Sequence, residues 1–103
     1  MRIIKEKTLW EYCRKNKYSR AREPLQAWIY LVRYSNWRNP AELKARLRSA
    51  SIIGSERVVF NIKGNNFRLV TDIDYKRSII FVAWFGTHTE YDNIDVKTVK
   101  YGD

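Results

Sequence analysis

The hydrophobic period of this sequence changes near Ile52, and this change constrains the fold more than any other feature. Before it, apolar residues recur every three or four positions, which is the spacing of a helix with one buried face. After it, Val58, Phe60 and Ile62 stand at alternate positions, as in a strand with one buried face. The sequence therefore predicts helices first and a sheet afterwards.

Three helices are expected in the front part of the chain. The first spans about residues 6–17. The second begins near Pro24, because proline needs no backbone donor in a first helical turn. The third is short and begins at Asn39 and Pro40, a capping residue followed by a first helical residue. The apolar faces of these helices are formed by Leu9, Cys13, Leu25, Trp28, Ile29, Val32, Leu43 and Leu47.

Strands are expected over residues 1–4, 58–63, 67–75 and 79–85. Residues 64–66 are Gly-Asn-Asn, which tolerate positive φ, so the second and third strands form a hairpin. The last strand is a near-continuous apolar run, typical of a central strand covered on both faces.

These elements predict an α+β domain over residues 1–103, with N-terminal helices packed on one face of a small, mainly antiparallel sheet. Hydrophobic residues make up 45% of the chain, so a compact core is expected and a disordered chain is excluded. The helices cover one face of the sheet, so the opposite face is left for function.

The positive charge is concentrated in the front half of the chain. The formal net charge is +9, and residues 1–57 carry all of this excess. A basic surface of this kind indicates an anionic partner, most often nucleic acid. The alternative for each residue is a solvated helix end, where the helix dipole favours cations. We call the densest cluster the basic segment, and it contains Arg14, Lys15, Lys17, Arg20 and Arg22.

The chain has one cysteine and no long apolar run. A single cysteine, Cys13, closes no intramolecular disulfide and builds no multi-cysteine metal site. A membrane helix needs roughly 18 consecutive apolar residues, and no segment approaches that length. We therefore expect a cytoplasmic protein with no metal, no cofactor and no membrane contact.

Polar residues converge at one end of the predicted sheet. Alternation places Asn61 and Lys63 on the face opposite the helices, and the hairpin returns Arg68 to their side. Two cations held on strands suit a phosphate. The alternative is that Lys63 borders an exposed turn and that Arg68 pairs with Asp72 or another neighbour.

The single histidine, His88, follows the last strand. Thr87 or Thr89 is expected to cap a short helical turn, which brings His88 close to Asp92 four residues later. Imidazole moves protons near neutral pH, and a carboxylate orients it. The alternatives are an exposed histidine and, for Tyr91, a packing aromatic residue.

Two segments resemble a known family, the HigB toxins of the RelE-like superfamily. They read FNIKGNNFRLV over residues 60–70 and FGTHTEYDNID over residues 85–95. The resemblance implies a RelE-like α+β fold and the toxin role in a type II toxin–antitoxin system. It also implies cleavage of mRNA on the translating ribosome, and inhibition by a HigA-type antitoxin with a helix-turn-helix fold.

The resemblance also suggests roles for the polar residues. Lys63 and Arg68 are expected to stabilise charge, while His88 serves as acid or base. Tyr91 assists proton transfer or stacks on a base. The remaining candidates hold substrate or contact ribosomal RNA; they are Asn61, Asn65 and Asp92 for substrate, and the basic segment for ribosomal RNA.

One alternative to an endoribonuclease remains open. A module that binds RNA or the ribosome without catalysis would block translation by occupancy. Replacing His88 with Ala would abolish cleavage in the first case and matter little in the second.

Overall fold

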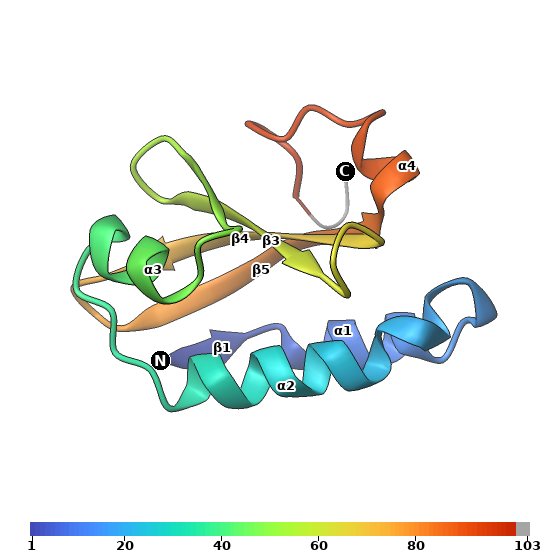
Figure 1. Cartoon of the computed structure of the whole chain (residues 1–103), viewed down its shortest axis with the longest axis horizontal. Helices are drawn as coiled ribbons and strands as arrows, with labels where there is room; N and C mark the ends of the chain where they lie inside the picture. Colours follow the sequence, from blue (N-terminus) through green and yellow to red (C-terminus); the bar gives the residue numbers. More distant parts are fainter. Residues whose placement is uncertain (101–103) are drawn as a thin grey trace.

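The computed structural model describes residues 1–100. After one short strand come the helices, then the other strands of the sheet, and one more helical turn lies near the end (Figure 1). In chain order the elements are β1 (Arg2–Ile4), α1 (Glu6–Cys13), the 3₁₀ helix η1 (Asn16–Ala21), α2 (Arg22–Arg33), α3 (Pro40–Arg46), β2 (Ser51–Ile53), β3 (Arg57–Ile62), β4 (Phe67–Asp74), β5 (Ile79–Thr87) and α4 (His88–Tyr91).

The strands of residues 1–100 form one five-stranded sheet in the order β1-β5-β4-β3-β2. β1 runs parallel to β5, and the other neighbouring pairs are antiparallel. Helices α1 and α2 lie along one face of this sheet (Figure 1). The predicted α+β class, with a mainly antiparallel sheet, is confirmed.

The main core lies between the helices and the sheet. Leu9, Leu25 and Val32 are fully buried on the helical side of this core. Phe60 and Phe85 belong to the same cluster, as strand alternation predicts. Packing of the helices on the sheet also fixes the ends of β3 and β4, where Asn61 and Arg68 lie.

The second face of the sheet is less open than expected. Val59, Val70 and Ala83 are buried there in a smaller cluster, and Val96 and Val99 pack against it. In Figure 1 the chain after α4 passes over this face. The expectation of a free face is therefore wrong in part, because the strands carry apolar residues on both faces and burying them is favourable.

Arg57 joins the chain after α4 to the sheet through hydrogen bonds. Its guanidinium donates two hydrogen bonds to the Asp72 carboxylate, at 2.8 and 2.7 Å. The remaining nitrogen donates to the carbonyl oxygens of Val96 and Val99, at 3.1 and 2.6 Å. Because Asp72 is occupied by Arg57, it is not the partner of Arg68.

The first helix is shorter than predicted. It ends at Cys13 instead of residue 17, and η1 follows. This break buries Tyr18, whose ring meets the rings of Tyr12 and Phe85 edge-on at 5.2 and 5.9 Å. Packing of an aromatic ring thus outweighs continuation of the helix. The short strand β2 was not predicted separately, because its three residues carry little periodicity.

Candidate active site

Helix α4 presents the histidine at the end of β5. Thr87 is its N-cap and accepts a hydrogen bond from the Glu90 N–H at 3.2 Å, while the Glu90 carboxylate accepts from the Thr87 N–H at 2.8 Å. This is a capping box, which fixes the start of the helix. The His88 N–H donates to the carbonyl oxygen of Asn66 at 2.9 Å, so α4 is also tied to the hairpin turn.

His88 and Asp92 meet as predicted. Nε2 of His88 lies 3.6 Å from a carboxylate oxygen of Asp92, one helical turn away. About half of each side chain is exposed, 52% and 60% respectively. The imidazole therefore lies near a carboxylate and is open to solvent or substrate, which suits a group that moves protons.

Arg68 lies on β4 and pairs with Gly86 of β5, two residues before His88. Its guanidinium donates to the carbonyl oxygen of Asn65 at 3.1 Å and stands 5.7 Å from the centre of the Tyr91 ring. The Asn65 amide oxygen accepts a longer bond at 3.4 Å. Asn61 is paired with Arg68 across the two strands. Arg68, Asn61, Asn65 and Tyr91 are thus brought together, and Arg68 pairs with a neighbour in the turn.

Lys63 borders an exposed turn, as the alternative interpretation had it. It lies after the end of β3, exposed, with a φ of 54°. Gly64 follows with a φ of 61°. Two consecutive residues of positive φ turn the hairpin, so strand alternation no longer determines the direction of the Lys63 side chain. Positive φ costs a residue with a β-carbon free energy, and such strain is common at functional sites.

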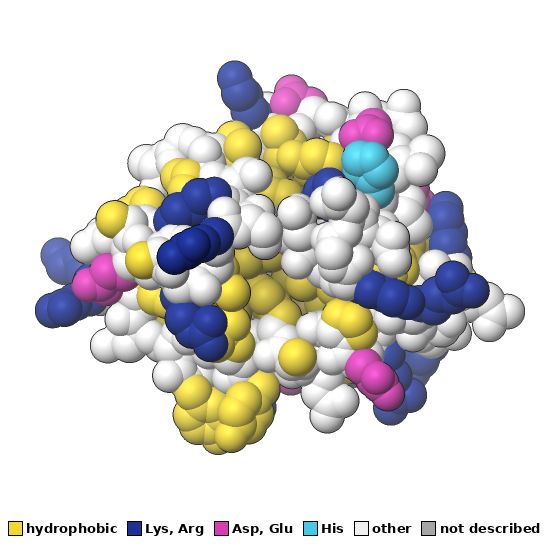
Figure 2. Space-filling model, in the orientation of Figure 1, with side chains coloured by type: hydrophobic (Ala, Val, Ile, Leu, Met, Phe, Trp, Pro, Cys, Tyr) yellow, Lys and Arg dark blue, Asp and Glu magenta, His cyan; other side chains and the backbone are white. Residues whose placement is uncertain are grey.

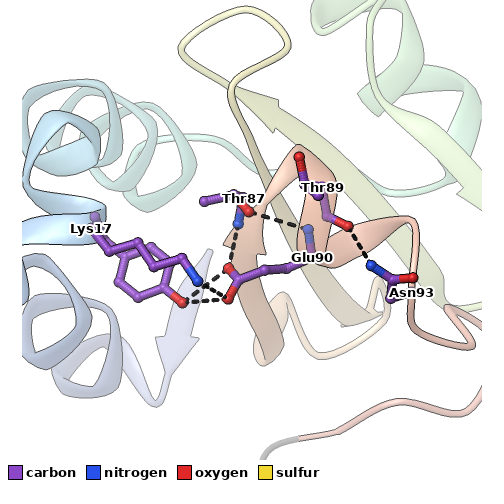
Figure 3. A network of polar contacts seen from close by, with 6 residues as sticks. Lys17, Thr87, Thr89, Glu90 and Asn93 are labelled. Carbon is purple, nitrogen blue, oxygen red and sulfur yellow. Dashed lines mark hydrogen bonds and ion pairs between the residues drawn. The ribbon is translucent and has the colours of Figure 1, made fainter.

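Glu90 is the residue that sequence reasoning missed. Its carboxylate accepts hydrogen bonds from Lys17 Nζ at 2.8 Å and from the Tyr18 hydroxyl at 2.9 Å (Figure 3). The spacing Thr87-x-x-Glu90 signalled the capping box. No sequence pattern signalled the contacts with Lys17 and Tyr18, which lie more than 70 residues earlier.

The Glu90 contacts change two pKa values. Burial of Glu90 raises its pKa, but hydrogen bonds from Lys17, the Thr87 N–H and Tyr18 outweigh it, so the pKa is lowered overall. Burial, followed by the hydrogen bond to the Glu90 carboxylate, raises the pKa of Tyr18 to about 12. Near neutral pH, Glu90 is therefore an anion and Tyr18 a neutral donor.

The residues of the basic segment differ in their contacts. Lys17 is paired with Glu90, and Lys15 lies 4.9 Å from the centre of the Tyr12 ring. Arg14 and Arg22 line a small pocket of about 170 Å³ together with Trp10 and Cys13. Arg20 lines a separate groove that reaches Thr87, the N-cap of α4. Figure 2 shows Lys and Arg side chains gathered toward both ends of the face that it presents.

Among residues 1–100, no group of three or more His, Cys, Asp and Glu side chains comes together in a way that suits a metal ion. No helix within these residues has both the length and the apolar character needed to cross a membrane.

The fold and this group of side chains define a small, basic α+β protein with a polar site at one end of its sheet. The chain belongs to the HigB toxin family, the RelE-like toxic component of a toxin–antitoxin system, whose family model matches residues 21–94. The predicted resemblance is confirmed, and the protein is a toxin with an antitoxin as its partner. A comparison with curated proteins finds no match. The match covers the candidate residues from Asn61 to Asp92 but only Arg22 of the basic segment.

Proposed function

We propose that this toxin is an mRNA endoribonuclease that acts on the translating ribosome. The observation that carries the proposal is the exposed pair of His88 and Asp92, 3.6 Å apart, on the helix that also places Tyr91 under the guanidinium of Arg68. A proton-transfer group and a fixed cation thus lie on adjoining elements. The acid–base route of RNA cleavage uses both kinds of group.

The reaction is attack of a ribose 2′-hydroxyl on the adjacent phosphorus. A base removes the 2′ proton, the new P–O bond forms, and the bond to the 5′-oxygen breaks. The products are a 2′,3′-cyclic phosphate and a 5′-hydroxyl, and the leaving oxygen takes a proton. In this proposal His88 moves one of these protons, while Arg68 and Lys63 stabilise charge on the phosphorane. Asn61 and Asn65 hold ribose or base edges, Asp92 orients His88, and Tyr91 positions Arg68.

Dependence on the ribosome follows from the openness of this site. The side chains of His88 and Asp92 are half exposed, and Lys63 lies in an exposed turn. Such a site does little to align a flexible RNA strand by itself, and in-line geometry contributes a large part of the barrier reduction. The ribosome supplies this alignment by holding the codon. Arg14, Lys15 and Arg22 of the basic segment, all exposed, are proposed to contact ribosomal RNA.

The proposal extends to the partner and the compartment. The antitoxin is a HigA-type helix-turn-helix protein, residues 1–103 act as one toxin domain, and the toxin works in the cytoplasm, where mRNA is translated. Co-purification of the two proteins from a strain that expresses both is expected, and recovery of the toxin alone would contradict the partner assignment.

The test is to map mRNA 5′ ends after the purified toxin is added to a translating extract. We compare the wild type, His88→Ala and the surface control Arg77→Ala, each with ribosomes and with the same RNA free in solution. The expected result is cuts that require ribosomes, persist in Arg77→Ala and fall by about 10²–10⁴-fold in His88→Ala. Stalled translation with intact mRNA would contradict the nuclease and would favour the alternative, a module that blocks translation by occupancy.

A further inference from the structure

An open groove of about 400 Å³ separates the 3₁₀ helix η1 from the end of the sheet. It adjoins the candidate active site directly: its wall includes Thr87, the N-cap of the helix that carries His88, and Asn66, whose carbonyl accepts the His88 N–H at 2.9 Å. The full lining is Asn16, Lys17, Arg20, Asn66, Phe67 and Thr87.

The groove offers donors for an anion. Lys17 and Arg20 are cations, and Asn16 and Asn66 are exposed amides. Phe67, the one large apolar residue of the lining, is only 5% exposed and therefore offers little surface to an apolar ligand. A phosphate group needs this combination of positive charge and hydrogen-bond donors.

The two cations of the groove differ in availability. Lys17 Nζ lies 2.8 Å from the Glu90 carboxylate and is paired with it (Figure 3). Arg20 is exposed, and within residues 1–100 no carboxylate lies within ion-pair distance of it. Arg20 is thus available to bind an anion, while Lys17 is already paired with Glu90.

We propose that this groove binds a phosphodiester of the single-stranded RNA substrate, next to the phosphate that is cleaved. Arg20 makes the main contact, and the Glu90–Lys17 ion pair sets the strength of the site. The inference rests on the proposed function for the identity of the strand. It assigns Arg20 and Lys17 to the substrate instead of to ribosomal RNA.

The test measures binding without cleavage. The probe is a short single-stranded RNA with 2′-O-methyl groups, which has no nucleophile. Its dissociation constant is measured against the free toxin at several salt concentrations. The variants are Arg20→Ala and, as a control of equal charge change at the opposite end of the sheet, Arg77→Ala. A third variant, Glu90→Gln, keeps an acceptor oxygen for Thr87 and Tyr18 but releases Lys17.

We expect Arg20→Ala to weaken binding about fivefold and to reduce the salt slope by about 0.7, the value for one phosphate on a single strand. Arg77→Ala leaves both unchanged, and Glu90→Gln tightens binding and steepens the slope. Equal effects of Arg20→Ala and Arg77→Ala, or no saturable binding at low salt, would overturn the proposal. Because the probe cannot be cut, this outcome is independent of whether the toxin is a nuclease.

Discussion

The hydroxyl of Tyr18 lies 2.9 Å from both carboxylate oxygens of Glu90, and this contact joins η1 to the helix that carries the histidine. Lys17, the residue before Tyr18, reaches the same carboxylate at 2.8 Å. One acidic side chain therefore links the start of the chain to the candidate active site. Glu90 thus holds α4 both through its capping box with Thr87 and through these contacts with η1.

The lowered pKa of Glu90 predicts an effect of pH on stability. A carboxyl group whose folded pKa lies below its ordinary 4.5 contributes stability above that value and loses it as the pH falls through the lowered pKa. We expect Glu90→Gln to lower the free energy of unfolding by about 1–2 kcal/mol at neutral pH. Urea unfolding at decreasing pH checks this, because the difference from wild type must shrink in acid. A difference that is constant with pH would show that the charge of Glu90 does not matter.

Substitution of Arg57 is expected to loosen the chain after α4 locally. Its side chain is only 13% exposed, and it bonds Asp72 and two carbonyl groups of the covering segment. Arg57→Lys keeps the charge but loses the two-pronged geometry, so we expect destabilisation of about 1–3 kcal/mol. Hydrogen exchange is expected to rise most at residues 96–99. Exchange that rises evenly over the whole sheet would contradict a local role.

Gly86 lies where the sheet meets α4, and there is no room for a larger side chain at this position. A β-carbon at this position would lie 2.4 Å from the nearest atom of the Trp84 ring and 2.9 Å from a carboxylate oxygen of Glu90. Gly86→Ala must displace the ring, and overpacking of this kind costs about 1–3 kcal/mol. Tryptophan fluorescence is expected to shift in this variant. The same substitution in a Trp84→Phe background separates a change at Trp84 from one at the other three tryptophans.

The positive φ of Lys63 leads us to expect that replacing this residue with Gly has opposite effects on stability and activity. Its φ of 54° suits glycine, so Lys63→Gly relieves strain and is expected to raise the free energy of unfolding by up to about 1 kcal/mol. If the ammonium group stabilises the phosphorane, the same variant loses cleavage. Lys63→Arg is the control, because it keeps a cation and the strain. Full activity in Lys63→Gly would remove Lys63 from the catalytic group.

Tyr91 predicts a difference between two substitutions. Arg68 stands 5.7 Å from the centre of the Tyr91 ring, a contact that needs the ring but not the hydroxyl. If Tyr91 only positions Arg68, Tyr91→Phe keeps cleavage near the wild-type rate and Tyr91→Leu lowers it. The rates of cleavage on ribosomes measure this difference. An equal loss in both variants would instead assign a proton-transfer role to the hydroxyl.

Several features of the fold were predictable because they depend on local pattern. The alternation of Phe60 and Ile62 gave the buried face of β3, and the Asn39 and Pro40 pair gave the start of α3. Thr87 was one of two expected caps for α4, and the spacing of His88 and Asp92 predicted their contact. Each of these relationships spans only a few residues.

Other features required the folded chain. The end of α1 at Cys13 is explained by the burial of Tyr18 against Phe85, which is distant in sequence. The pairing of Arg57 with Asp72 removed one possible partner of Arg68. The covering of the second sheet face also depends on residues far along the chain.

The sequence by itself determined the order of helices and strands, the basic front half and the family, because each is written in local spacing, composition or short motifs. Only the tertiary structure decided that Glu90 binds Lys17 and Tyr18, and that Arg20 lines a groove beside His88. The physical reason is that these contacts join residues more than 40 positions apart. Packing of the helices on the sheet brings such residues together, and no local pattern encodes their distance.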